Sequence, residues 1–142
     1  MRPIRSWNDF SSRGPLNLLV DTHILLWSLA EPEKLTQPCR VALTDPENQI
    51  WVSAVSVWEI VIKAQRGKLQ IPNDWAAGIK AQDFQVLSFE ARHALAVSGL
   101  PLHHQDPFDR ALLAQARSEN LRLVTADADM KRYRSEIDLL EC

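Results

Sequence analysis

The chain has 142 residues, of which 46% are hydrophobic and 24% are charged, and its formal net charge is −2. This composition is typical of one soluble globular domain and excludes collagen, a coiled-coil rod and a disordered tail. A chain of this length buries roughly 70% of its unfolded surface, so its core does not require disulfides. The weakly acidic balance also argues against a global positive field of the kind that attracts nucleic acid.

Residues 1–15 are polar, have no clear period and end in Arg13-Gly14-Pro15, which predicts a flexible leader before a single domain over residues 16–142. From residue 16 onward, short apolar runs alternate with stretches of helical periodicity. The apolar runs predict strands over residues 16–20, 49–52, 84–87, 121–124 and 137–140. The intervening stretches predict helices over residues 22–30, 36–43, 53–65, 72–82, 88–98, 107–119 and 126–133. This alternation is typical of a three-layer α/β/α fold with a central, mainly parallel sheet.

Three features bear on the cellular compartment. The first fifteen residues contain basic side chains but no following apolar run, which argues against a signal peptide. No stretch approaches the roughly 20 apolar residues of a membrane span. The two cysteines, Cys39 and Cys142, suggest neither a disulfide framework nor a metal-ligand spacing. We therefore expect a protein of the reducing cytoplasm that has no membrane partner.

Acidic residues gather where predicted strands end and the next helices begin. Right-handed crossovers bring the carboxyl ends of parallel strands to one edge of the sheet, where ligands bind in open α/β folds. The acidic residues at this edge are Asp21, Glu59, Asp106, Asp109, Asp127 and Asp129. Taken singly, each is explained by helix capping: Ser56 and Glu59 match a capping box, Asp106 precedes a proline, and Thr125 or Asp127 precedes the last helix.

Taken together, the carboxylates point to a metal site. Asp21 interrupts an apolar run and Glu59 follows a mostly apolar segment, where unpaired negative charges repel and are costly to bury. Carboxylate oxygens without histidine or cysteine partners suit Mg²⁺ or Mn²⁺ better than zinc. Such a site activates water and stabilises charge on a phosphate, as in nucleases. Both one ion and two are compatible with this residue set.

Other side chains that carry chemistry have simpler explanations. We interpret His103-His104 as a solvated loop pair and His23 as a residue that packs locally. Trp27, Trp51 and Trp58 lie in apolar segments and are expected in the core, whereas Trp7 and Trp75 suit exposed positions. The local basic residues either complement helix ends or contact RNA phosphates. The candidates for RNA contact are Lys63, Arg66, Lys68 and Arg110.

Four short motifs occur in order: LLVDTH at 18–23, VWEI at 57–60, DPFDR at 106–110 and LVTAD at 123–127. In these motifs the chain resembles the PIN-domain ribonucleases and, among them, the VapC-type toxins of bacterial toxin–antitoxin pairs. The resemblance covers about residues 16–142. One departure is His23, where many members of the family have Asn or Ser.

The resemblance implies a metal-dependent endoribonuclease that uses Mg²⁺ or Mn²⁺ to activate water against an RNA phosphodiester. It implies that Thr22 supports the first carboxylate. It also implies a cognate antitoxin that inserts an arginine near the carboxylates, and a homodimer. The metal ligands and catalytic residues would be Asp21, Glu59, Asp109 and Asp127, supported by Asp106, Thr125 and Asp129.

Two alternatives compete with this interpretation. A non-catalytic RNA- or protein-binding module on a PIN-like scaffold is disfavoured because all four carboxylates are present. A phosphatase of the haloacid dehalogenase type requires Asp-x-Asp after the first strand, whereas the second residue after Asp21 is His23. If four of the 18 acidic residues belong to a metal site, the formal charge of the rest changes from −2 to +2, so the charge balance no longer excludes RNA.

Overall fold

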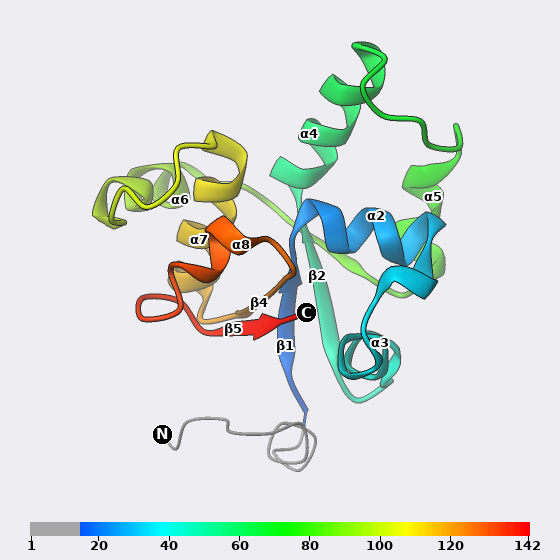
Figure 1. Cartoon of the computed structure of the whole chain (residues 1–142), viewed down its shortest axis with the longest axis horizontal. Coiled ribbons are helices and arrows are strands. Elements are labelled where there is room, and N and C mark those ends of the chain that lie inside the picture. The colour runs from blue at the N-terminus through cyan, green and yellow to red at the C-terminus, as the bar shows by residue number, and fades with distance from the viewer. Residues whose placement is uncertain (1–14) are drawn as a thin grey trace.

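The computed structural model describes residues 15–142, so the expected leader, apart from Pro15, lies outside the described residues, as does Trp7. One sheet crosses this part of the chain, with strand order β3-β2-β1-β4-β5 (Figure 1). Each neighbouring pair of strands is parallel, which confirms the predicted α/β class. The strands are β1 (Asn17–Val20), β2 (Gln49–Ser53), β3 (Gln85–Leu87), β4 (Arg122–Thr125) and β5 (Leu139–Glu141).

The helices lie close to their predicted positions, and the largest differences occur at their ends. The helix predicted over 72–82 begins only at Trp75, after Asp74. The helix predicted over 88–98 is shortened to six residues, because Glu90 and His93 form a capping box at its start and a 3₁₀ turn, η2 (Val97–Gly99), follows it. The helices are α2 (Thr22–Ala30), η1 (Pro32–Lys34), α3 (Gln37–Thr44), α4 (Ala54–Gln65), α5 (Trp75–Ala81), α6 (Ala91–Ala96), α7 (Pro107–Glu119) and α8 (Ala128–Lys131).

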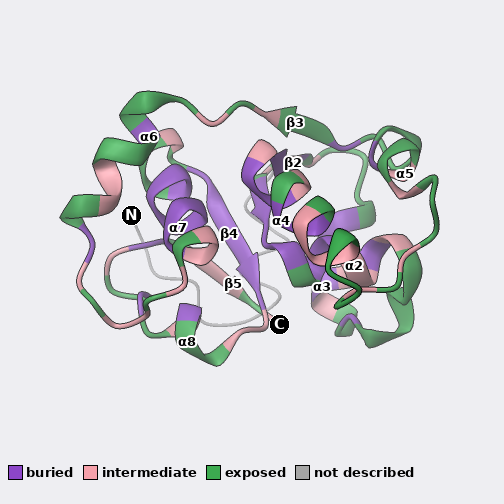
Figure 2. Ribbon diagram, turned by 90° about the horizontal axis from the view of Figure 1, so that it is seen from above, coloured by how far each residue is buried: buried purple, intermediate pink, exposed green. Residues whose placement is uncertain are grey.

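The sheet lies between two helical layers, each with its own apolar core (Figure 2). Alternation along β1 divides the two cores, because successive side chains of a strand point to opposite faces. Leu18 and Val20 pack with α2, α3 and α5, whereas Leu19 packs with α7 and α8. The buried strands β1 and β4 therefore form a rigid centre, at whose carboxyl edge side chains can be held in fixed positions.

The topology creates a switch point beside β1. From β1 the chain proceeds outward through β2 and β3, and then returns to place β4 on the other side of β1. The loops after β1 and β4 therefore lead to helices on opposite faces, and a crevice opens between them. The backbone N–H of Asp21 donates to the carbonyl of Val124 across this point at 3.0 Å. Asp21 thus lies where open α/β folds bind their ligands.

Two sequence-based expectations about the core were wrong. Cys39 in α3 and Cys142 after β5 form a disulfide with their Cα atoms 6.1 Å apart, although they are 103 residues apart in the chain. The spacing of two cysteines does not reveal a pairing that only the packing of the last strand creates. Trp58 is 60% exposed rather than buried, and its ring packs edge-on against Phe108 with the centroids 5.2 Å apart. Over residues 15–142, no helix has the length and apolar character needed to cross a membrane.

Candidate active site

An acidic groove of about 360 Å³ opens at the carboxyl edge of the sheet. All four carboxylates expected to bind metal line this groove, although they come from segments far apart in the sequence. His23, expected to pack locally, also lines it, and its ring centroid lies 6.1 Å from that of Trp27. The acidic side chains that line the groove, together with the imidazole nearest to them, are Asp21, Glu59, Asp106, Asp109, Asp127 and His104.

Asp21 both caps a helix and faces the groove. Its Oδ1 accepts the backbone N–H of Ile24 at 2.8 Å, which caps α2, and its Oδ2 accepts from the Thr125 hydroxyl at 2.5 Å. The side chain is only 2% exposed. Burial, with a smaller contribution from the charge of Asp109, raises the pKa of Asp21 to about 6. The capping role and the metal-binding role are therefore compatible, because a carboxylate has lone pairs for both.

Glu59 is held by side chains rather than by the predicted capping box. Ser53 caps α4 by accepting from the backbone N–H of Val55 at 3.0 Å, so the capping box predicted from Ser56 to Glu59 is wrong. Glu59 accepts from the Thr22 hydroxyl at 2.7 Å and from Lys63 Nζ at 2.6 Å.

The two threonines serve different carboxylates from those expected. The resemblance implied that Thr22 supports the first carboxylate, Asp21. In the structure Thr22 donates to Glu59 instead, because it lies in the first turn of α2 and faces α4. Thr125, at the end of β4, supports Asp21 and also accepts from the backbone N–H of Asp127 at 3.0 Å. Thr125 thus ties the first and fourth carboxylate segments together.

Asp106 and Asp109 lie at the start of α7. Asp106 is the predicted cap, since its Oδ1 accepts the backbone N–H of Asp109 at 3.0 Å ahead of Pro107. Asp109 Oδ2 lies 2.8 Å from Nε2 of His104. Burial raises the pKa of Asp109 to about 6; the hydrogen bond from His104 opposes this rise, and nearby carboxylates, Asp106 foremost, add to it.

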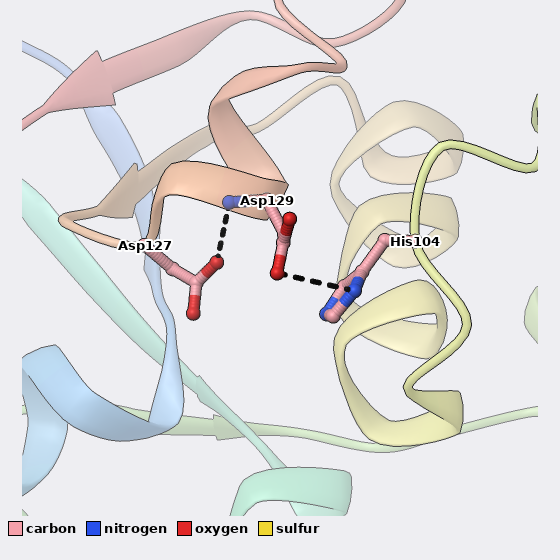
Figure 3. Close-up of side chains that lie close together, drawn as sticks. All are labelled: His104, Asp127 and Asp129. Carbon is pink, nitrogen blue, oxygen red and sulfur yellow. Dashed lines mark hydrogen bonds and ion pairs between the residues drawn. The ribbon is translucent and has the colours of Figure 1, made fainter.

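Asp127 is the cap of the last short helix. Its Oδ1 accepts the backbone N–H groups of Asp129 at 2.8 Å and Met130 at 3.2 Å. This confirms Asp127, rather than Thr125, as the cap of α8. Asp129, expected as a supporting residue, is exposed at the rim, where Figure 3 shows it between Asp127 and His104.

His104 is the groove residue that the sequence missed. The prediction of a solvated loop pair was wrong for this histidine, which contacts Asp109 and lies near both Asp127 and Asp129. Burial on its own would lower the pKa of His104, but the hydrogen bond to Asp109 and the charges of nearby carboxylates raise it overall. Its position just before the cap of α7 indicated that it could lie near the acidic residues. The path of the loop, however, decides whether His103 or His104 turns inward.

The basic residues divide between the groove and other parts of the structure. Lys63 and Lys68 line the groove. Arg66 is exposed at the C-cap of α4 and is not among the residues that line the groove. Arg110 is 9% exposed and donates to the carbonyls of Pro101 at 3.0 Å and Val97 at 3.2 Å. The expectation that Arg110 contacts RNA is therefore not supported by its position.

The donor set of the groove fits a hard divalent cation. Of its acidic side chains, Asp21 and Asp109 have pKa values raised to about 6, as expected when buried carboxylates lack sufficient positive charge. Lys63 neutralises part of this charge through Glu59. Oxygen-rich sites of this kind suit Mg²⁺ or Mn²⁺. The residues that would hold the ion are Asp21, Glu59, Asp109 and Asp127.

The fold and site define an open α/β protein with a carboxylate centre at its switch point. A family model described as PIN domain matches residues 18–136, so the chain belongs to the PIN-domain family. It is similar to "Ribonuclease VapC22" of Mycobacterium tuberculosis, with 26% identity over 120 residues that cover 82% of this chain and 92% of that protein.

Solved structures share the same fold. VapBC2 from Rickettsia felis, bound to a DNA fragment from its promoter, superposes with a TM-score of 0.67 and 16% identity over 89% of this chain and 99% of the other. DNA-bound VapBC from Salmonella typhimurium gives a TM-score of 0.62 and 17% identity over 89% and 98%. A toxin–antitoxin complex from Klebsiella pneumoniae gives 0.59 and 18% identity over 87% and 95%.

Proposed function

We propose that the chain is a metal-dependent endoribonuclease and the toxin of a toxin–antitoxin pair. The observation that carries this proposal is the convergence of four carboxylates from four distant segments in one groove. Membership of the PIN-domain family and the similarity to a protein named as a ribonuclease support it. Fold neighbours that are VapBC complexes support the toxin role.

The proposed hydrolysis needs a metal ion and side chains that hold its ligands in place. A bound Mg²⁺ or Mn²⁺ would lower the pKa of a water molecule and neutralise charge on the phosphate. Asp21 and Glu59 are held in fixed orientations by the Thr125 and Thr22 hydroxyls, and Asp109 is held by His104. Such supporting hydrogen bonds orient ligands and strengthen a metal site.

Positive side chains at the groove provide contacts for the RNA backbone. Lys63 and Lys68 line the groove, and Arg66 is exposed at the C-terminal end of the same helix as Lys63. We propose that these three side chains contact phosphates of the substrate, which position the strand without reading its sequence. We also propose a cytoplasmic location, because the proposed substrate is RNA.

Two protein partners fit different faces. We propose that a cognate antitoxin blocks the acidic groove with an arginine, since guanidinium groups pair well with carboxylates. A second, apolar cavity of about 610 Å³ lies between α4, α6 and α7, and its lining includes Trp58 and Phe108. Because Trp58 is 60% exposed at this apolar hollow, and exposed aromatic side chains favour protein contacts, we propose that this face forms the homodimer.

The test of the proposed activity is cleavage of RNA by the purified chain with Mg²⁺ or Mn²⁺. Asp109→Asn is expected to abolish cleavage and growth inhibition while the fold survives. Asp74→Asn is the matched control, because Asp74 is the exposed N-cap residue before α5 and its side chain makes no capping bond. Metal-dependent cleavage that persists in an Asp21→Asn, Asp109→Asn double variant would contradict the proposal.

Thermal unfolding of the purified chain with and without metal distinguishes a metal-dependent enzyme from a non-catalytic binding module. A metal-binding enzyme should be stabilised against heat by Mg²⁺ or Mn²⁺ in a way that depends on Asp21, because a ligand that binds only the folded state raises its stability. A non-catalytic module should bind RNA or protein without this metal-dependent stabilisation.

A further inference from the structure

Three side chains of metal-ligand type converge on the rim of the groove. His104 lies on the loop before α7, Asp127 caps α8, and Asp129 lies in the first turn of that helix. One potential ligand atom from each lies within 4.8 Å of the other two. Figure 3 shows the imidazole facing Asp129, with Asp127 beside them. Only Asp127 belongs to the proposed carboxylate centre, so the cluster extends beyond that centre.

The orientation of the His104 ring leaves one nitrogen for a cation. Its Nε2 lies 2.8 Å from Oδ2 of Asp109, and its Nδ1 lies 3.7 Å from Oδ2 of Asp129. In a neutral imidazole only one nitrogen carries hydrogen, so if Nε2 donates to Asp109, Nδ1 presents a lone pair to Asp129. Metal-binding histidines commonly donate their other N–H to a carboxylate in this way. Nδ1 of His104 and Oδ2 of Asp129 then face each other as two acceptors. A cation between them would be bound by both atoms.

The carboxylates of the cluster also have oxygens to offer. The α8 cap uses Oδ1 of Asp127, which leaves Oδ2 for an ion. Arg132 lies 3.6 Å from Oδ1 of Asp129, whereas Oδ2 of Asp129 is the atom that faces His104. Each carboxylate thus has one oxygen committed to the protein or close to a cation and a second oxygen available as a ligand.

The loop that carries His104 is held in place from the interior. The hydroxyl of Tyr133 accepts the backbone N–H groups of His103 at 3.1 Å and His104 at 3.0 Å, and donates to the carbonyl of Pro101 at 2.7 Å. Arg110 donates to the carbonyl of His104 at 3.3 Å. Because these contacts hold the backbone on both sides of His104, the imidazole position does not depend on its own contacts alone.

We propose that His104, Asp127 and Asp129 form a binding site for a divalent first-row transition-metal ion beside the carboxylate centre. A donor set of one imidazole and two carboxylates suits Mn²⁺ and its heavier neighbours better than Mg²⁺, which prefers oxygen ligands alone. This site deepens the proposed function and rests on it only through the shared Asp127. The rim of the groove therefore selects transition-metal ions, whereas the carboxylate centre accepts Mg²⁺.

Mn²⁺ added to the full chain without RNA is the probe. Pulsed electron paramagnetic resonance of bound Mn²⁺ detects coupling to a ¹⁴N ligand nucleus, so the wild-type chain should show a nitrogen-coupled ion. In His104→Gln this coupling should disappear, and the dissociation constant of that ion should rise at least about 10-fold. His103→Gln is the matched control, because Nε2 of His103 lies 4.0 Å from Glu136, outside the cluster, and it should keep both properties.

Two further variants make the test decisive. Asp129→Asn alters an exposed side chain outside the carboxylate centre, and it should weaken the nitrogen-coupled ion even if His104→Gln fails to fold. Wild-type Mn²⁺ without nitrogen coupling, or unchanged coupling and affinity in both variants, would overturn the proposal. Asp21→Asn should retain the nitrogen-coupled ion. If the wild-type chain binds this ion but does not cleave RNA, the proposed function is contradicted and the metal site is not.

Discussion

Two neighbouring regions bury ionisable side chains in opposite ways. In the Arg110 cluster, formed by Arg110, Tyr133 and the loop carbonyls around them, one cation meets several acceptors. In the acidic groove, carboxylates outnumber cations, and the pKa values of Asp21 and Asp109 rise to about 6. Buried groups with partners stabilise a fold, whereas buried charges without sufficient partners weaken it. We therefore interpret the groove as a ligand site and the Arg110 cluster as a support for the fold.

The largest expected difference between the groove and the Arg110 cluster is in the effect of Asp21→Asn. We expect cleavage of RNA to fall at least about 100-fold, since a proposed metal ligand is lost. The metal-free chain should become more stable by roughly 1–3 kcal/mol, because a buried charge with a raised pKa is removed. Cleavage assays and urea unfolding without metal measure the two effects. A less stable variant would show that Asp21 serves the fold more than the ligand.

The reverse result is expected for Arg110→Met. This variant keeps the apolar stem but removes the guanidinium that donates to the carbonyls of Pro101 and Val97, and we expect it to lower the free energy of unfolding by about 1–3 kcal/mol. Urea unfolding measures the loss. Arg66→Met, at an exposed position, is the control and should change stability by less than about 0.5 kcal/mol. Equal losses of stability in Arg110→Met and Arg66→Met would show that the Arg110 cluster does not support the fold.

The stability of the metal-free chain should depend on pH through the groove. Asp21 and Asp109 have folded pKa values near 6, above the ordinary value of 3.8, so the folded chain keeps protons that the unfolded chain has lost. The free energy of unfolding should therefore fall as pH rises from about 4 to about 6, by on the order of 2–3 kcal/mol. Unfolding curves at several pH values test this slope.

Two comparisons sharpen the pH experiment. Asp21→Asn should flatten the slope and Arg110→Met should preserve it, because only the first variant removes a titrating group of the groove. Saturating Mg²⁺ should also reduce the slope, since the ion takes the place of the protons. A slope that is insensitive to Asp21→Asn would assign the pH dependence to other groups.

The smallest expected effect concerns the exposed rim. Lys68→Ala should raise KM for RNA by about 2–5-fold, leave kcat nearly unchanged and weaken the dependence of binding on salt, because one phosphate contact is lost. Steady-state cleavage at two salt concentrations measures this. Lys80→Ala on α5, exposed and outside the groove, should leave KM unchanged.

The convergence of the carboxylates was predictable because it follows from topology. Once strands and helices alternate, the first residues after β1 and β4 must reach the same edge of the sheet. The partners of these carboxylates were not predictable in the same way. Thr22 faces Glu59 and Thr125 faces Asp21, and this assignment depends on how α2 packs against α4 and how β4 lies beside β1.

The sequence by itself determined the α/β class, the order of its elements and the acidic edge, because periodicity and capping signals are local. Only the tertiary structure decided that Arg110 points inward, that His104 enters the groove and that Cys39 meets Cys142. These outcomes depend on loop paths and on contacts between residues distant in the chain. Such contacts arise from the packing of whole layers, which leaves no local pattern in the sequence.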